Sequence, residues 1–407
     1  MVKTAIPGNL DRLKEIVLKA AEKLYPTQVE WRRWLHQHPE LSNREFDTTK
    51  FILEQLKKRG VKTVPLKMKT GALALMNEKK GIALAIRTDI DALPIDEKNK
   101  VAFKSRNDGI MHACGHDIHM AVVLGTTVLL SILKENLPGA VKVIYQPAEE
   151  MPPGGAEMMI REGILRNPDV KMVLSLHNDP SLAVGKIGLR DGPIMASVTD
   201  FDITVIGRGG HAARPHLGVD AIVTATEIVE SLQKIVSRET DPFQPVVITF
   251  GMISGGRARN VICDRVQICG TARTLSAASR KVIPNLIRRT VDGVCRARGA
   301  EYKIDFIAQY PVLSNWPEAN KIFAECYTTL FGPGKVVTSP QSMGGEDFAN
   351  YIQKIPGAML RLGVRNRKIG ATEPWHSDKF MADERSIFYG TSLLTLAAIK
   401  GLGEIAK

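Results

Sequence analysis

Short apolar segments that alternate with helical segments constrain the fold of this chain most strongly. Residues 81–86, 140–145 and 171–176 are rich in apolar residues, and the first is a continuous run typical of a strand buried on both faces. An apolar helical segment at residues 122–130 separates the first two strands. This alternation predicts an α/β fold with a mixed, mostly parallel sheet flanked by helices.

Each of these strands leads to residues that can bind metals or transfer protons. The first ends near Asp89 and Asp91 and is followed by residues 111–119, which hold three of the nine histidines and one of the five cysteines. The second runs into Gln-Pro-Ala-Glu-Glu at 146–150, and the third ends at His177. Because ligands gather at the carboxyl edge of α/β sheets, these residues can converge there. The two aspartates also suit caps of the following turn.

The candidate site residues combine a thiol, imidazoles and carboxylates. They are Cys114, His116, Glu149, Glu150, His177 and His376. One thiolate, three imidazoles and a carboxylate favour Zn²⁺, Mn²⁺, Co²⁺ or Ni²⁺ over Ca²⁺ or Mg²⁺. Five ligands exceed the roughly three that one open catalytic zinc needs, and suit two metal ions about 3.5–4 Å apart.

The adjacent pair Glu149-Glu150 suggests a division of roles. In extended backbone, neighbouring side chains point in opposite directions, so one glutamate would bind metal while the other acts as general base on water. Taken alone, such a pair also suits a solvated acidic turn. Cys114 and His116 taken alone would equally suit a buried free cysteine beside a surface histidine.

The N-terminal region is predicted to be helical. Residues 8–24 form one amphipathic segment, and a second helical spacing runs from Trp31 until Pro39 breaks it. His36 and His38 near that break are either ligands or helix-end residues. Residues 42–45 (Ser-Asn-Arg-Glu) resemble a capping box. The helix that follows is predicted to stop at Gly60 and to bury Phe46, Ile52, Leu53 and Leu56.

The pattern changes after residue 192. Strands and helices follow in the order βαββαβ, which is that of a ferredoxin-like unit. Pro284 is expected in the first turn of the second helix of this unit, where proline is tolerated. We therefore expect a catalytic metal-binding domain in residues 1–192, an inserted ferredoxin-like α+β lid or dimerisation domain in 193–309, and the second part of the catalytic domain in 310–407.

Composition narrows the possible partners and the compartment. The net charge is +12 and the pI near 9.4, but the basic residues are dispersed and aromatic residues make up only 6%. This argues against a nucleic-acid binder and fits a solvated basic surface or the steering of anionic substrates. The five scattered cysteines favour a reducing compartment. No signal-like segment or apolar run of about 18 residues occurs, so we expect a cytoplasmic protein that does not contact membranes.

Several motifs together resemble those of the aminoacylase/carboxypeptidase metallohydrolases. The cysteine-containing loop resembles more narrowly the amidohydrolase branch, which includes hippurate hydrolases, auxin-conjugate hydrolases, N-acetyldiaminopimelate deacetylases and some thermostable carboxypeptidases. The resemblance extends from Trp31 to Ala397. The motifs are His-Ala-Cys-Gly-His-Asp at 112–117, Gln-Pro-Ala-Glu-Glu at 146–150, Gly-Gly-Ala at 154–156, Gly-Arg-Gly-Gly-His-Ala-Ala-Arg-Pro-His at 207–216 and Gly-Gly-Glu-Asp-Phe at 344–348.

The resemblance implies a phosphorylase/hydrolase-like fold and a role for each matching residue. Glu149 would be the general base, and Asp91 would orient a ligating imidazole without binding the metal itself. The ligands of two divalent metal ions (Zn, Mn, Co or Ni) would be Cys114, His116, Glu150, His177 and His376.

The inserted domain would contribute further residues. His211 resembles the family histidine that stabilises the tetrahedral oxyanion, often in the partner subunit's site, and Asn260 and Arg273 match positions that hold the substrate carboxylate. From the residues alone, His211 also suits a surface histidine and Arg273 an exposed strand arginine. Trp375 before His376, Asp378 where relatives commonly have Pro, and the basic segment 257–260 depart from the family pattern.

The resemblance implies an N-acyl-L-amino acid amidohydrolase that works as a homodimer or homotetramer. A carboxypeptidase for short peptides shares every motif, so only substrates separate the two. A non-enzymatic metal-binding protein on the same fold would be favoured by a replaced ligand or base, and none is replaced.

Overall fold

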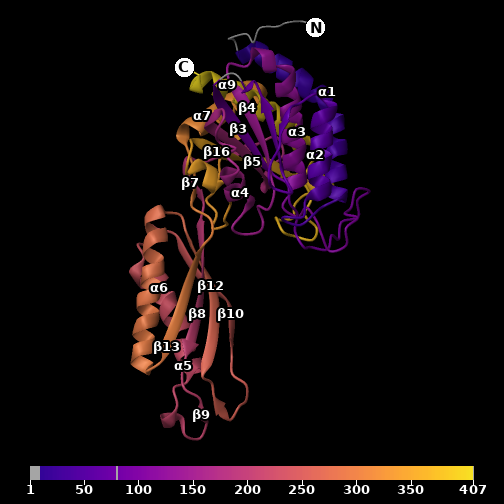
Figure 1. The fold of residues 1–407 in the computed structure, drawn as a ribbon. Coiled ribbons are helices and arrows are strands. Elements are labelled where there is room, and N and C mark those ends of the chain that lie inside the picture. Colours follow the sequence, from indigo (N-terminus) through magenta and orange to yellow (C-terminus); the bar gives the residue numbers. More distant parts are fainter. Residues whose placement is uncertain (1–9, 79–80, 407) are drawn as a thin grey trace. The chain divides into compact units, whose positions relative to one another are not determined.

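The computed structural model describes residues 10–78 and 81–406, which form two compact units (Figure 1). Unit 1 consists of residues 1–192, 314–340 and 350–407, and unit 2 of residues 193–313 and 341–349. From the sequence, residues 341–349 were expected to belong to the catalytic domain instead. The backbone of Ser342 explains the difference, because it hydrogen-bonds to Ile194 and Ala196 of unit 2.

Unit 1 is built on a mixed sheet, as predicted. β3 runs parallel to β4 and β5, and β16 runs parallel to β5, whereas β2 is antiparallel to β4 and β6 to β16. The strand order across the sheet is β1 (Thr63–Val64), β2 (Ala72–Met76), β4 (Ala140–Gln146), β3 (Ile82–Asp89), β5 (Asp169–Ala183), β16 (Gly357–Arg365), β6 (Ile187–Leu189) and β15 (Val336–Thr338).

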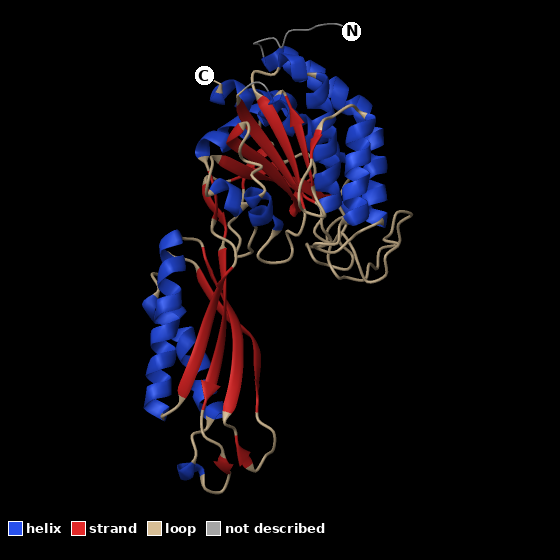
Figure 2. Ribbon diagram, viewed as in Figure 1, coloured by secondary structure: helices blue, strands red, loops and turns tan. Residues whose placement is uncertain are grey.

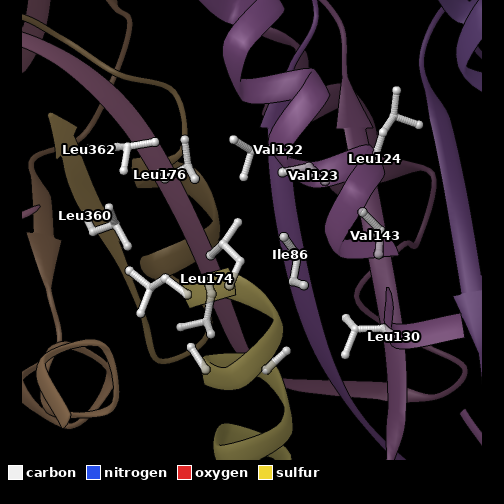
Figure 3. Close-up of a cluster of buried hydrophobic side chains, with 14 of the residues drawn as sticks. Ile86, Val122, Val123, Leu124, Leu130, Val143, Leu174, Leu176, Leu360 and Leu362 are labelled. Atoms are coloured by element: carbon white, nitrogen blue, oxygen red, sulfur yellow. The ribbon is translucent and has the colours of Figure 1, made fainter. Parts of the chain in front are cut away.

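Helices flank this sheet (Figure 2). They are α1 (Leu10–Gln37), α2 (Phe46–Lys58), α3 (His116–Ile132), α4 (Gly155–Arg161), α7 (Pro317–Phe331), α8 (Ala349–Ile352) and α9 (Arg385–Ile405). Figure 3 shows Val122, Val123 and Leu124 of α3 among buried side chains of β3, β4, β5 and β16. Each such fully buried aliphatic side chain stabilises the fold by about 1.5–3 kcal/mol. This core fixes the start of α3 against the strand ends.

The N-terminal helical region differs from the prediction. One continuous helix, α1, replaces the two expected segments and holds Pro26 in its interior. It ends at Gln37, just before Pro39, and α2 ends at Lys58, just before Gly60, so both predicted stops are confirmed.

The predicted capping box at residues 42–45 is wrong. The side chain of Glu45, the residue before α2, makes no capping hydrogen bond. Instead, the carboxylate of Glu40 accepts the N–H groups of Asp47 and Thr48. The helix thus begins at Phe46, about one turn later than the capping box predicts. Ile52 and Leu56 are buried as predicted, but Phe46 is 50% exposed and Leu53 37% exposed, so the buried face is narrower than expected.

Unit 2 has its own core between a four-stranded antiparallel sheet and two helices. The elements follow as β8 (Ser197–Ile206), α5 (Ala221–Lys234), β10 (Val246–Gly255), β12 (Arg265–Thr274), α6 (Ala277–Arg298) and β13 (Glu301–Ala308), with sheet order β10-β12-β8-β13. Two small strand pairs complete the described strands: β9 (Gly210–His211) with β11 (Val261–Ile262), and β7 (Gly192–Met195) with β14 (Leu313–Asn315).

Pro284 lies in the interior of α6 and not in its first turn, contrary to expectation. The helix begins earlier than predicted because the Ser276 side chain accepts the N–H groups of Ala278 and Ser279. Among the described residues, no helix is both long and apolar enough to cross a membrane.

Candidate metal centre

The five predicted metal ligands lie in unit 1 and form two groups of three. Cys114 precedes α3, His116 is its first residue, Glu150 follows β4, His177 lies within β5, and His376 lies in the loop between β16 and α9. The ligand atoms of Cys114, His116 and His177 lie within 4.8 Å of one another. Those of Cys114, Glu150 and His376 do as well. The two triads therefore share the thiol of Cys114.

Hydrogen bonds orient two of the imidazoles toward this cluster. His116 Nδ1 lies 2.9 Å from the backbone oxygen of Asp91, and His177 Nδ1 lies 2.8 Å from that of Asn178. Because a carbonyl only accepts, each Nδ1 carries the proton and each Nε2 keeps a lone pair. His177 Nε2 is 3.5 Å from Cys114 Sγ. Each ring, in its neutral form, thus directs the Nε2 lone pair toward the shared thiol.

Two buried atoms in the cluster have no hydrogen-bond partner among the described residues. They are His116 Nε2 and Glu150 Oε1, which lie 3.8 Å apart. His376 Nε2 is 3.5 Å from the same Glu150 oxygen. Leaving buried polar atoms unpaired costs free energy, which coordination of a cation would recover. The donor set and its unpaired atoms therefore fit a pair of transition-metal ions.

The cluster carries a negative electrostatic potential. Burial raises the pKa of the Cys114 thiol well above its usual range, and the charges of Glu150, Glu149 and Asp89 raise it further. Burial lowers the pKa of His116, but nearby carboxylates outweigh burial and raise that pKa to about 10. For His177, burial lowers the pKa, which keeps the ring neutral. The potential that holds protons on Cys114 and His116 also attracts divalent cations, whose binding displaces protons.

Asp91 organises the surroundings of the cluster. Its Oδ2 accepts the Ser42 hydroxyl at 2.7 Å and the Glu150 backbone N–H at 2.9 Å, and its Oδ1 lies 3.3 Å from His116 Nδ1. Asp89 Oδ1 accepts from His119 Nδ1 at 2.7 Å. Of the two sequence interpretations for these aspartates, the contacts favour a role in the site. Asp91 is placed to orient both the His116 imidazole and the Glu150 backbone.

Glu149, the predicted general base, is buried beside the ligands. Its carboxylate lies within 4.8 Å of ligand atoms of His116 and Glu150. The preceding residue, Ala148, has a left-handed backbone with φ of 54° and donates its N–H to Glu45 Oε1 at 2.8 Å. This tight turn requires glycine at position 155, because a Cβ there would lie 1.8 Å from the Pro147 carbonyl oxygen. The turn thus sets the directions of the paired glutamates.

Two supporting residues, Ser42 and Glu45, were not identified as part of the site from the sequence. Both reach it from the loop between α1 and α2, Ser42 through Asp91 and Glu45 through Ala148. Their spacing resembled a local capping box, which hid contacts to residues 49 and 103 positions away. Only three-dimensional proximity reveals this role.

The structure distinguishes the two interpretations of His36 and His38. His36 lies in a buried network, with Nδ1 2.8 Å from Asp117 Oδ2 and Nε2 3.1 Å from Glu97 Oε1. Arg32 Nε lies 2.7 Å from the same Asp117 oxygen. His38 Nδ1 bonds to the Trp34 carbonyl, as expected for a helix-end residue. Neither histidine joins the described ligand groups.

His112 and His119 also lie outside the two triads. His119 Nδ1 donates to Asp89, and its Nε2 accepts the backbone N–H of Asn178 at 2.9 Å. His112 is buried, and burial lowers its pKa to about 3. His119 thus supports the strand that carries His177, whereas His112 is a neutral packing residue.

In unit 2, the predicted substrate-binding residues lie at opposite ends of the sheet. His211 is exposed on β9, and its neighbour Ala212 donates to the backbone oxygen of Asn260, so these residues are close. Arg273 lies near the far end of β12, where it donates to the Met343 carbonyl at 3.1 Å. Eight residues of extended strand separate it from Arg265 at the β9 end, or about 26 Å.

The chain also matches known proteins in sequence and in structure. The model of Peptidase family M20/M25/M40 matches residues 85–400. N-acetylcysteine deacetylase of Bacillus subtilis is 38% identical over 90% of this chain and 95% of its own. Thermostable carboxypeptidase 2 of Saccharolobus solfataricus is 37% identical over 91% of this chain and 94% of its own. The crystal structure of the Bacillus subtilis YXEP protein, a dinuclear metal binding peptidase from the M20 family, superimposes with a TM-score of 0.83 at 34% identity, covering 94% of this chain and 99% of that one.

Proposed function

The chain belongs to peptidase family M20/M25/M40, and from this premise we propose that it is a two-metal enzyme that releases the amino acid from N-acyl-L-amino acids. That it is a hydrolase of amide or peptide bonds follows from the family and from relatives named as deacetylases, amidohydrolases and carboxypeptidases. The observation that carries the finer proposal is the pair of ligand triads that share Cys114.

The residues divide between the two metal positions. Cys114, His116 and His177 would hold one ion, and Cys114, Glu150 and His376 the other. Zn²⁺, Mn²⁺, Co²⁺ and Ni²⁺ suit this mixture of thiolate, imidazole and carboxylate. When bound, such ions supply Lewis-acid chemistry, which polarises the scissile carbonyl and makes water nucleophilic near neutral pH.

Glu149 would carry the proton. Its buried carboxylate accepts a proton from the attacking water and then delivers it to the nitrogen of the departing amino acid. Its turn is held from behind by Glu45 and its neighbour Glu150 by Asp91, so the carboxylate is oriented before substrate binds. General acid–base catalysis of this kind contributes about 10²–10⁴-fold to the rate.

Unit 2 would complete the site, and we propose that two copies of the chain are needed. An N-acyl amino acid cannot contact both Arg273 and the His211–Asn260 pair of one chain, because about 26 Å of strand separates them. We propose a homodimer in which His211 and Asn260 of one subunit stabilise the oxyanion and the substrate carboxylate in the other subunit's site. A homotetramer built from such dimers would serve equally.

A substrate panel tests this function. Metal-free enzyme is reloaded with each of the four cations and assayed with acetyl- and benzoyl-amino acids and with dipeptides. Glu149→Gln is the matched control, since it keeps a side chain of the same size without a basic carboxylate. We expect it to retain bound metal and to lose at least about 10²-fold in kcat. Undiminished turnover in this variant would contradict the role of Glu149.

A second candidate function is that of a carboxypeptidase for short peptides. It is supported by the similarity to the thermostable carboxypeptidases. The same panel decides, because a carboxypeptidase would prefer the dipeptides over the acyl amino acids. We also propose a cytoplasmic location, since the five cysteines are free thiols, as a reducing compartment would keep them.

A further inference from the structure

Among the five proposed ligands, His376 has the weakest support from its own backbone. Its side chain is 53% exposed, whereas that of His116 is 1% exposed. It lies in a loop and has a φ of 62°, in the left-handed region that non-glycine residues rarely adopt. One backbone hydrogen bond, from its N–H to the Ala113 carbonyl at 2.9 Å, ties it to the cysteine loop. Such a conformation persists only where neighbouring contacts impose it.

The preceding residue, Trp375, supplies such contacts. Its indole Nε1 donates to Asn178 Oδ1 at 3.0 Å. Its ring meets that of His177 edge-on, with centroids 5.3 Å apart and an interplanar angle of 87°. The guanidinium of Arg361 lies 5.4 Å from the indole centroid, within cation–π range. Trp375 therefore connects the loop of His376 to the strand of His177.

Asn178 is a fixed acceptor for this indole. Its Nδ2 donates to the Cys114 carbonyl and to His119 Nε2, which leaves Oδ1 directed at Trp375. The amide is held in a confined space, because a Cβ on Gly115 would lie 2.5 Å from Nδ2. A donor that bonds to such an immobile acceptor is itself held in place.

We propose that Trp375 is a positioning residue that holds His376 in the triad with Cys114 and Glu150. It does so through the hydrogen bond to Asn178 and the ring contact with His177, without binding a metal itself. The inference rests on the proposed two-metal function and adds a residue to it. It predicts that loss of Trp375 weakens one metal position selectively, because His116 and His177 of the other triad are held by α3 and β5.

Metal titration of the metal-free protein by calorimetry with Zn²⁺ tests the proposal. We expect the wild-type chain to bind two equivalents. In Trp375→Leu, the second equivalent should bind about 10- to 100-fold more weakly, the usual effect of removing a residue that orients a ligand. Trp375→Phe keeps a ring beside His177 and lacks the N–H donor, so its second equivalent should be weakened less than that of Trp375→Leu.

Asp378→Asn is the matched control in the same loop. Asp378 pairs with Lys98, whose side chain is 61% exposed, and exposed pairs contribute little to structure. This variant should bind both equivalents as wild type does. Circular dichroism shows whether each variant is folded. In the titration, the affinity for the first equivalent serves as an internal reference, so that selective weakening of the second can be told from unfolding.

Three outcomes would overturn the proposal. Wild-type affinity for both equivalents in Trp375→Leu would show that His376 needs no such support. Equal weakening of both equivalents would show that Trp375 supports the whole cluster and not His376. Fewer than two equivalents in the wild-type chain would overturn the two-metal function, and this inference with it.

Discussion

Glu45 should make the stability of the metal-free protein depend on pH between about 4.5 and 7. The side chain is fully buried, and its Oε1 accepts the Ala148 N–H. Within residues 10–78 and 81–406, its Oε2 has no hydrogen-bond partner. Burial raises the pKa of Glu45 from 4.5 to about 7, and the nearby charge of Asp91 adds to the effect. The folded state thus keeps a proton on Glu45 that the unfolded chain releases.

The sign and size of the pH effect on the free energy of unfolding follow from this difference in pKa. Between pH 4.5 and 7 the folded state binds more protons than the unfolded state, so the free energy of unfolding falls as pH rises. A shift of one pKa unit corresponds to about 1.4 kcal/mol, so the full loss is about 3 kcal/mol and is complete above pH 7. Below pH 4.5 the residue is neutral in both states and this cost vanishes.

Glu45→Gln isolates this contribution. Glutamine has the same shape and keeps an acceptor for the Ala148 N–H, but it has no proton to lose. In urea unfolding with a chelator present, the stability of the variant relative to wild type should rise by about 3 kcal/mol from pH 4.5 to pH 8. Other titrating groups cancel in that difference. A stability difference that stays constant over this range would refute the argument.

Three further substitutions test the framework of the site. Arg32→Met removes the guanidinium 2.7 Å from the buried Asp117 carboxylate and should lower the free energy of unfolding by about 3–5 kcal/mol in urea. The control Arg33→Met, at a 49% exposed side chain, should lower it by less than about 1 kcal/mol. Equal losses in the two variants would contradict the importance of the buried pair. Cys114→Ala removes the ligand common to both triads, so elemental analysis should find fewer than two metal ions per chain, and full occupancy would count against it. Gly155→Ala places a Cβ 1.8 Å from a backbone carbonyl oxygen. It should lower the free energy of unfolding by at least about 1–3 kcal/mol and also reduce kcat. Wild-type stability and wild-type kcat would together show that the turn can shift freely.

The sheet and the convergence of the candidate residues were predictable from the sequence because both follow from apolar runs and from the residues at their ends. Apolar runs located β3 and β4, and the rule that ligands gather at the carboxyl edge of such a sheet brought His116 and Glu150 together. The predicted strand at residues 171–176 was too short, but this error did not change where its candidate residue lies. His177 lies within the longer β5 instead of at its end, and still reaches Cys114.

The contacts that orient the ligands were beyond prediction because they join distant positions. Glu45 and Ala148 are 103 residues apart, and Trp375 and Asn178 are 197 apart. No short-range spacing encodes such a pair. In the case of Glu45, the local spacing favoured a different hydrogen bond, the capping box, which the structure does not contain.

The placement of acidic residues would make the stability of the metal-free protein and its proposed metal affinity oppose each other. Asp89, Asp91 and Glu150 raise the pKa of His116 to about 10, against the effect of burial. Like charges in a buried region repel one another and lose hydration, so the fold bears a cost that a hydrophobic replacement would avoid. A divalent cation reverses the sign of that potential, and its binding free energy adds to the stability of the folded state alone. In the proposed two-metal enzyme, the same carboxylates that destabilise the metal-free protein would therefore favour metal binding at both triads.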